Sequence, residues 1–397
     1  MKRPRLNLHT FVLSIAISLL VPTGQASAQC SEVASGLRLP LGITQSNLDN
    51  LIVGESGTRA LHTGRISIIS PNGSRRTLLD GLPSAINDVN EPSGPAGVYM
   101  RGRTLFVAIG IGDGIQAGPF PGAAVGNPSP SSPIFSSVLA IHFSANVEAT
   151  TEGFVLTTAD QLSLANGAKV TLSDDAGDRL TLELVANFPN FTPNPLPTFP
   201  ANVRGSNPFD LVAVEDQLYV TDGGQNQVRQ IDVPTGTFTT LAAFAPIPNP
   251  FYPGIGGPVI EAVPTGIRYG DGQLLVSLFK GVPFPVGVSQ IQAVDPISGA
   301  QAPFIVGRKT AIDVLSLRDG DDTDYLVLQH ASLGLFFTGP GQVLRFETPA
   351  DAPTLVSDCS SPSFTPLTRP SSMVLDEKTD TLYATEFGGR VVGIPIP

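Results

Sequence analysis

Motifs that mark common catalytic and nucleotide-binding sites are absent from this sequence of 397 residues. It contains no G-x-S-x-G elbow, no H-E-x-x-H pair and no phosphate-binding loop of the G-x-x-x-x-G-K-S/T type. With only two cysteines, it also lacks a cysteine cluster that could hold a metal ion. The enzyme classes that depend on these motifs are therefore excluded.

Positive charge is also scarce. The chain has 23 basic and 34 acidic side chains, and charged residues make up only 14% of it. Three of the basic residues fall within residues 1–28, so the remainder carries 20 basic against 34 acidic groups. Such an acidic surface argues against nucleic acid or an anionic membrane as a partner. The many short apolar segments argue against disorder.

A long apolar run occurs only near the N-terminus. Residues 1–28 combine Lys2, Arg3 and Arg5 with the run FVLSIAISLLV and the small-residue sequence Ala26-Ser27-Ala28. This pattern predicts a secretory signal peptide cleaved before Gln29, so we expect a secreted or periplasmic protein. The run is too short for a membrane-spanning helix, and no later segment is longer.

Turn-forming residues are abundant, with 41 glycines and 37 prolines. The stretch from Asn207 to Leu241 shows how they are used: NPFDLVAVEDQLYVTDGGQNQVRQIDVPTGTFTTL. Four short segments of alternating polarity are separated by tight turns, which predicts a four-stranded antiparallel meander. This is the pattern of one β-propeller blade.

The same pattern recurs six times. Its opening, a proline followed after one residue by glycine or aspartate and then an aliphatic residue, starts at Pro40, Pro95, Pro208 and Pro264. Degenerate copies start at Ala311 and Pro370. Each is followed by a hydrophobic strand such as LIVGE or LYVTD and then by a third segment such as GRISII or QVRQI. The sequence therefore predicts an all-β fold, a six-bladed β-propeller spanning residues 29–397.

The last copy ends without a fourth strand, and this gap predicts how the ring closes. Residues Ser31–Ser35 can supply the missing strand and pair the N-terminus with blade six. Cys30 precedes this strand, and Cys359 follows the outer strand of blade five. In an exported protein the pair predicts a disulfide, with two buried free thiols as the alternative.

One spacing between copies is far longer than the others, which places an insertion in blade two at residues 145–201. Within it, Thr158–Gln161 resembles a capping box that begins a short helix, and a hairpin and a proline-rich tail follow. We expect an extended outer edge for blade two. A docking arm for a partner is the alternative.

Three stretches resemble the ScyD/ScyE family, exported bacterial propeller proteins named after genes of the cyanobacterial scytonemin cluster. They are NPFDLVAVEDQLYVTDGGQNQVRQID, the insertion GFVLTTADQLSLANGAKVTL with LTLELVANFPN, and the loop FKGVPFPVGVSQI. The resemblance extends from about Leu39 to Gly393. It implies an extracytoplasmic propeller and no particular reaction.

Propeller geometry predicts a candidate site at one mouth of the central channel, where first strands begin and second strands end. We expect the strand ends and the inner wall to present polar groups there, with Lys280 in a neighbouring loop as a counter-charge. The predicted residues are Glu55, Asp222, Glu386, Gln329 and His330 at strand ends, and Asp210 and Asp313 on the inner wall. Such a site would bind a polar small molecule or a divalent cation such as calcium. The alternative is that the carboxylates cap turns.

Three function classes remain. A non-catalytic protein that binds a small molecule or another exported protein is our first hypothesis, since no nucleophile or base is evident. A metal-dependent hydrolase or lactonase is the second, although no acidic residue follows the opening residue of any of the six copies. The family name alone suggests a third, an auxiliary role in periplasmic pigment or small aromatic metabolism. No cofactor is evident from the sequence.

Overall fold

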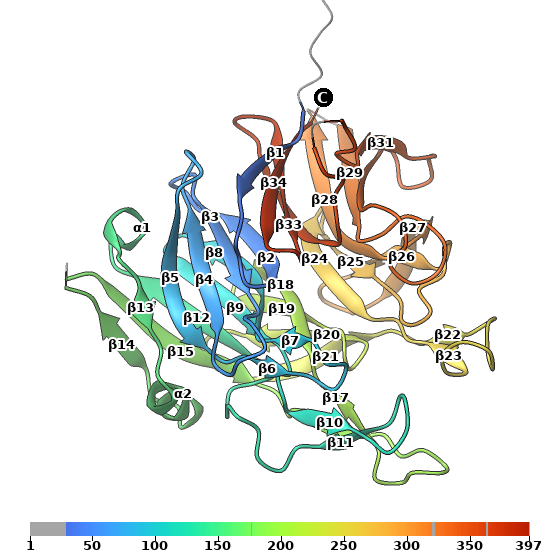
Figure 1. Cartoon of the computed structure of the whole chain (residues 1–397), viewed down its shortest axis with the longest axis horizontal. Helices are drawn as coiled ribbons and strands as arrows, with labels where there is room; N and C mark the ends of the chain where they lie inside the picture. Colours follow the sequence, from blue (N-terminus) through green and yellow to red (C-terminus); the bar gives the residue numbers. More distant parts are fainter. Residues whose placement is uncertain (1–28, 176, 320–321, 363, 397) are drawn as a thin grey trace, which may run out of the picture.

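A computed structural model describes residues 29–175, 177–319, 322–362 and 364–396. Six sheets, antiparallel except for one parallel pair at the outer edge of blade one, are arranged around a central axis as the blades of a propeller (Figure 1). This confirms the predicted fold class. The predicted signal peptide, residues 1–28, lies outside the described residues.

In each blade the strand that carries the opening motif lies innermost, and the other strands follow outward from it. Blade one is β2 (Pro40–Gln45), β3 (Leu51–Glu55), β4 (Gly64–Ile69), β5 (Arg75–Leu82) and β13 (Phe154–Val155). Blade two is β8 (Pro95–Arg101), β9 (Thr104–Ile109), β12 (Ser137–Phe143), β15 (Arg179–Asn187) and β14 (Val170–Ser173). Blade three is β18 (Pro208–Val214), β19 (Gln217–Asp222), β20 (Gln227–Asp232) and β21 (Phe238–Ala243).

Blades four, five and six have four strands each, like blade three. Blade four is β24 (Pro264–Gly270), β25 (Gln273–Leu278), β26 (Ser289–Val294) and β27 (Gln301–Arg308). Blade five is β28 (Ala311–Asp319), β29 (Asp322–Gln329), β30 (Gln342–Phe346) and β31 (Thr354–Ser357). Blade six is β32 (Pro370–Asp376), β33 (Thr381–Glu386), β34 (Arg390–Pro395) and β1 (Ser31–Ala34).

The repeated opening motif has a structural reason. In all six blades the pairing of the first two strands shifts register just after the motif's first residue, so the motif forms a β-bulge. The inner strands of adjacent blades then approach closely. A Cβ at Gly42 would lie 2.4 Å from the carbonyl oxygen of Ala96, and one at Gly266 would lie 2.7 Å from the Cα of Asp313. Glycine is therefore required where the strands come closest.

The ring closes as predicted. β1 pairs antiparallel with β34, with Ser31 opposite Gly393 and Glu32 opposite Val392. A disulfide joins Cys30 to Cys359, whose Cα atoms are 5.6 Å apart. Because Cys30 precedes β1 and Cys359 follows β31, the bond fastens the closing strand of blade six to the outer edge of blade five.

The insertion in blade two lies between the third and fourth strands of that blade. It contains α1 (Val147–Thr150), β13, α2 (Thr158–Ala165) and β14, all beside β5 and β15 in Figure 1. β14 extends the outer edge of blade two, whereas β13 pairs with β5 of blade one. The capping box of α2 begins at Thr157 with Asp160, one residue before the predicted position.

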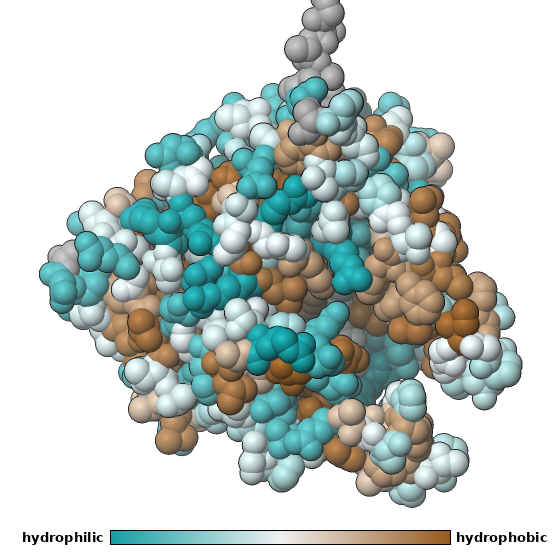
Figure 2. Space-filling view, in the orientation of Figure 1, coloured by the Kyte–Doolittle hydropathy of each residue, from teal (hydrophilic) through white to brown (hydrophobic). Residues whose placement is uncertain are grey.

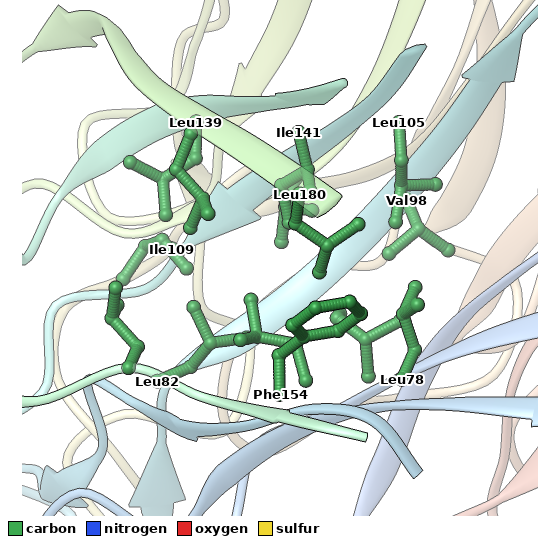
Figure 3. Close-up of a cluster of buried hydrophobic side chains, with 14 of the residues drawn as sticks. Leu78, Leu82, Val98, Leu105, Ile109, Leu139, Ile141, Phe154 and Leu180 are labelled. Carbon is green, nitrogen blue, oxygen red and sulfur yellow. The ribbon is translucent and has the colours of Figure 1, made fainter. Parts of the chain in front are cut away.

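The insertion is part of the largest apolar core cluster, which lies between blades one and two. Phe154 of β13 is 3% exposed and lies between Leu78 and Leu82 of β5 in Figure 3, facing Leu180 of β15. Full burial of a Phe side chain stabilises a fold by about 2–3 kcal/mol. No helix in the described part of the chain is long and apolar enough to cross a membrane.

Candidate functional site

The three acids predicted at the channel mouth lie in separate buried ion pairs. Each forms its pair with an arginine of the adjacent third strand. The pairs are Glu55 Oε2 with Arg65 Nη2 at 2.6 Å, Asp222 Oδ2 with Arg229 Nη2 at 3.0 Å and Glu386 Oε2 with Arg390 Nε at 2.6 Å. All three carboxylates are at most 1% exposed. The structure does not bring them together as a shared site.

A second contact explains why these strand ends carry an acceptor. Each carboxylate accepts a hydrogen bond from a backbone N–H of the segment that enters the first strand of its own blade. The donors are Arg38 at 2.5 Å, Asn207 at 2.8 Å and Thr368 at 2.6 Å. In blade five Gln329 Oε1 accepts from the N–H of Lys309 at 3.0 Å. These side chains hold the entries of blades one, three, five and six in place, as the turn-capping alternative predicts.

Asp210 and Asp313, predicted on the inner wall, belong to a buried triad with Arg268. Arg268 donates to Asp210 Oδ2 at 2.6 Å and to Asp313 Oδ2 at 2.7 Å, so the triad joins the inner strands of blades three, four and five. Burial raises the pKa of Asp313 to about 6 even though the guanidinium acts in the opposite direction. The triad therefore ties blades together inside the channel.

Lys280, the predicted counter-charge, lies outside this region. It lines a separate surface hollow with Gln290 and Gln292, and burial lowers the pKa of its ammonium group. Within the described residues, no group of three or more His, Cys, Asp or Glu side chains is placed to hold a metal ion. The divalent cation stays a prediction from the sequence.

A cleft of about 460 Å³ opens at the channel mouth. Its floor is apolar, and most floor residues occupy repeated positions. Phe209, Thr265 and Ile312 directly follow the first residue of an inner strand, while Phe279, His330 and Phe387 directly follow the end of a second strand. Because side chains alternate along a strand, the residue after each of these three strand ends faces the cleft instead of the blade interior.

The walls of the cleft come from short hairpins on the same face. These are β6 (Ala85–Ile86) with β7 (Pro92–Ser93), β10 (Ile115–Ala117) with β11 (Ala124–Gly126), and β16 (Phe191–Pro193) with β17 (Val203–Gly205). The hairpin of β22 (Ile247–Pro248) and β23 (Val259–Ile260) does not line the cleft, but Glu261, which follows β23, does. Figure 2 shows this side of the molecule hollowed between the protruding β10–β11 and β22–β23 hairpins. Ala124 N–H donates to Asn202 Oδ1 at 2.9 Å, which fastens two of the wall segments together.

His330 is the polar side chain within the aromatic part of the floor. It is 2% exposed and lies within an aromatic cluster, with ring centroids 5.4 Å from Phe279, 4.9 Å from Phe337 and 5.0 Å from Phe387. Its Nδ1 lies 2.9 Å from the carbonyl oxygen of Pro370. Burial lowers the pKa of the imidazole to about 4, and the hydrogen bond to Pro370 offsets only part of this effect. The ring is therefore neutral near pH 7.

A buried lysine fixes the loop that carries Phe337. The ammonium group of Lys309 donates to the carbonyl oxygens of Leu333, Gly334 and Phe336 at 2.6–2.7 Å and to that of Phe284 at 3.2 Å. It thereby joins the loops after β25 and β29. The rings of Phe284 and Phe337 are 4.5 Å apart as a result of this packing. This part of the aromatic floor is thus held in place before any ligand binds.

The rim of the cleft is polar and mainly acidic. Arg204 Nη2 forms an ion pair with Glu261 Oε2 at 2.7 Å, so the charges of these two side chains cancel. Asp88 and Glu91 of the β6–β7 loop also line the cleft. Partial burial raises the pKa of the Asp88 carboxyl group. A ligand would therefore meet an apolar floor and an acidic entrance.

The sequence analysis does not predict most of the residues that line this cleft. Of the predicted site residues, only His330 lines the cleft. The walls come from the long connections in blade two and its neighbours. A signal was present, since 27 residues separate the second and third strands of blade two but only 8 separate those of blade one. A connection of that length is often functional.

The neutral state of His330 gives a pH dependence that can be measured. The imidazole has a pKa of about 4 in the folded protein and 6.5 without these contacts, so only the unfolded chain gains a proton in between. The folded state therefore loses stability as the pH falls through this window. From pH 7 to pH 5, wild type is expected to lose about 2 kcal/mol of unfolding free energy relative to His330→Phe. Urea titrations at both pH values would check this, and equal losses in both proteins would contradict it.

Comparison with known proteins adds little beyond the fold. The sequence matches no family model, and no curated protein matches it. A gluconolactonase from Xanthomonas campestris superimposes with a TM-score of 0.48 at 12% identity, covering 93% of this chain and 89% of the other. Streptogramin B lyase gives a TM-score of 0.41 at 12% identity, covering 93% and 97%. These values carry no argument about activity.

Proposed function

We propose that this protein is exported and binds a small, mainly aromatic molecule in the cleft at the channel mouth, without performing a reaction on it. The observation that carries this proposal is the aromatic floor formed by Phe209, Phe279, Phe337 and Phe387 around His330. Aromatic side chains around a few polar groups are typical of small-molecule sites, and 460 Å³ is within the usual size range.

Export is supported by the pattern of residues 1–28 and by the disulfide, since such bonds persist in oxidising compartments. The resemblance to the ScyD/ScyE family implies the same location, and we propose that the chain belongs to that family. The rigid floor supports binding in particular. The loop that carries Phe337 is already held by the Lys309 ammonium group, so it loses little conformational freedom when a ligand enters.

The proposal can be tested with small aromatic probes. Titration calorimetry with indole is expected to show binding to wild type, and Phe387→Ala should weaken it about 10-fold because one face of the site is lost. Phe251→Ala is the matched control, since Phe251 is 38% exposed and does not line the cleft. Affinity unchanged in Phe387→Ala, or reduced equally in both variants, would contradict binding in this cleft.

A further inference from the structure

We infer that the buried end of the ligand carries an O–H or N–H group, which donates a hydrogen bond to Nε2 of His330. This inference rests on the proposed function of the cleft and narrows the ligand class to aromatic compounds with a phenolic hydroxyl or a ring N–H. It makes His330 the residue that selects among aromatic molecules of similar size.

A hydrogen bond fixes the position of the proton on the imidazole. Nδ1 lies 2.9 Å from the carbonyl oxygen of Pro370, and a carbonyl oxygen can only accept a hydrogen bond. In the neutral ring the proton is therefore on Nδ1. Nε2 is then unprotonated and can accept a hydrogen bond.

Aromatic rings surround the imidazole that carries Nε2. The neighbouring rings of Phe279, Phe337 and Phe387 pack edge-on against the imidazole and offer no polar hydrogen. In the described part of the chain, no side chain or backbone group donates to Nε2, and His330 lines the cleft. Nε2 is thus the polar atom on the aromatic floor that a ligand would cover.

Covering Nε2 with a ligand has a free-energy cost that depends on whether the ligand carries a donor. Once a ligand excludes water, an acceptor without a donor loses its hydrogen bond and gains nothing in return. A ligand that supplies a donor avoids this penalty, whereas an ether or an N-methyl compound of the same shape does not. Discrimination by a missing partner is stronger than discrimination by size alone.

The charges around the cleft act against two other ligand classes. Arg369 lies over the ring of Phe337, at 4.9 Å, and its charge disfavours a protonated His330. The ring therefore cannot donate to a carboxylate or phosphate at neutral pH. At the entrance, Asp88 and Glu91 repel anions. Neutral and cationic aromatic donors remain.

Paired probes in which a methyl group replaces the donor hydrogen test the inference. Titration of wild type at neutral pH with indole and N-methylindole, and with phenol and anisole, is expected to show about 10- to 100-fold tighter binding of each donor. Equal binding within both pairs would overturn the inference and leave the proposed cleft function standing. If no member of either pair binds, the inference and the proposed function both fail.

Two variants separate the role of Nε2 from packing. His330→Phe keeps an aromatic ring but removes the acceptor, so the preference for indole over N-methylindole should disappear. His330→Gln retains an amide oxygen that can accept and an NH₂ group that can donate to Pro370, so the preference should persist. A preference that survives in His330→Phe would overturn the assignment of Nε2 as the acceptor.

Discussion

Replacing both Cys30 and Cys359 with serine is expected to lower the free energy of unfolding by about 4–5 kcal/mol, the largest single effect expected in this protein. The two residues are 329 positions apart, so the bond constrains nearly the whole described chain in the unfolded state. The native ring also depends on it, because β1 pairs with β34 through only three residues.

Urea unfolding of the double variant and of wild type, each with and without a reducing agent, would measure this effect. Reduced wild type should match the double variant, and the reducing agent should not change the variant further. Phe238→Leu, on an outer strand far from the bond in sequence, would serve as a reference for ordinary packing changes. An unfolding midpoint of wild type that does not change on reduction would contradict a stabilising role for the bond.

Arg268→Met is expected to destabilise the fold by about 3–5 kcal/mol at pH 7, because it leaves Asp210 and Asp313 buried without a counter-charge. The pKa of Asp313 is already about 6 with the guanidinium present and would rise further without it. A raised carboxyl pKa favours the folded state at low pH. The defect should therefore shrink as the pH falls from 8 to 5.

The matched control for this variant is Arg318→Met. Arg318 pairs with Asp271 on the surface, where the two side chains are 67% and 44% exposed, so its loss should cost under about 1 kcal/mol. Adding Asp210→Asn and Asp313→Asn to Arg268→Met should restore most of the lost stability. If Arg268→Met and Arg318→Met had equal effects at all pH values, the triad would not be a structural element.

The fold could be predicted because its signals are local and repeated. The bulge motif marks the first strand of each blade. All six predicted starts, from Pro40 to Pro370, coincide with the start of an inner strand. The missing fourth strand of blade six and the position of Cys30 and Cys359 were enough to predict the closure.

The candidate site could be predicted only in part, for a physical reason. The sequence placed Glu55, Asp222 and Glu386 at equivalent strand ends, and this is where they lie. It did not show which way each side chain points. Arginines in the facing third strands, such as Arg65 and Arg390, were visible in the repeats and could have indicated ion pairs.

The aromatic floor of the cleft, unlike its walls, has no sequence signature. Phe279, His330 and Phe387 are one residue beyond the strand ends, and Phe209 follows a motif proline. They come from four different blades and share no residue type pattern that spacing could reveal. Their proximity exists only once the ring closes, since a propeller collects equivalent positions from distant parts of the chain.

Nitrogen-15 NMR of protein labelled on histidine would test the central claim most directly, since His62, His142 and His330 are the histidines of the described chain. His142 lies in blade two, bonded to Thr104 and Glu183, and His62 contacts Gln161, so both report on regions away from the cleft. Addition of indole is expected to shift the unprotonated Nε2 signal of His330 alone, and Phe387→Ala should reduce that shift. Binding of indole that leaves the His330 signals unchanged would contradict the account.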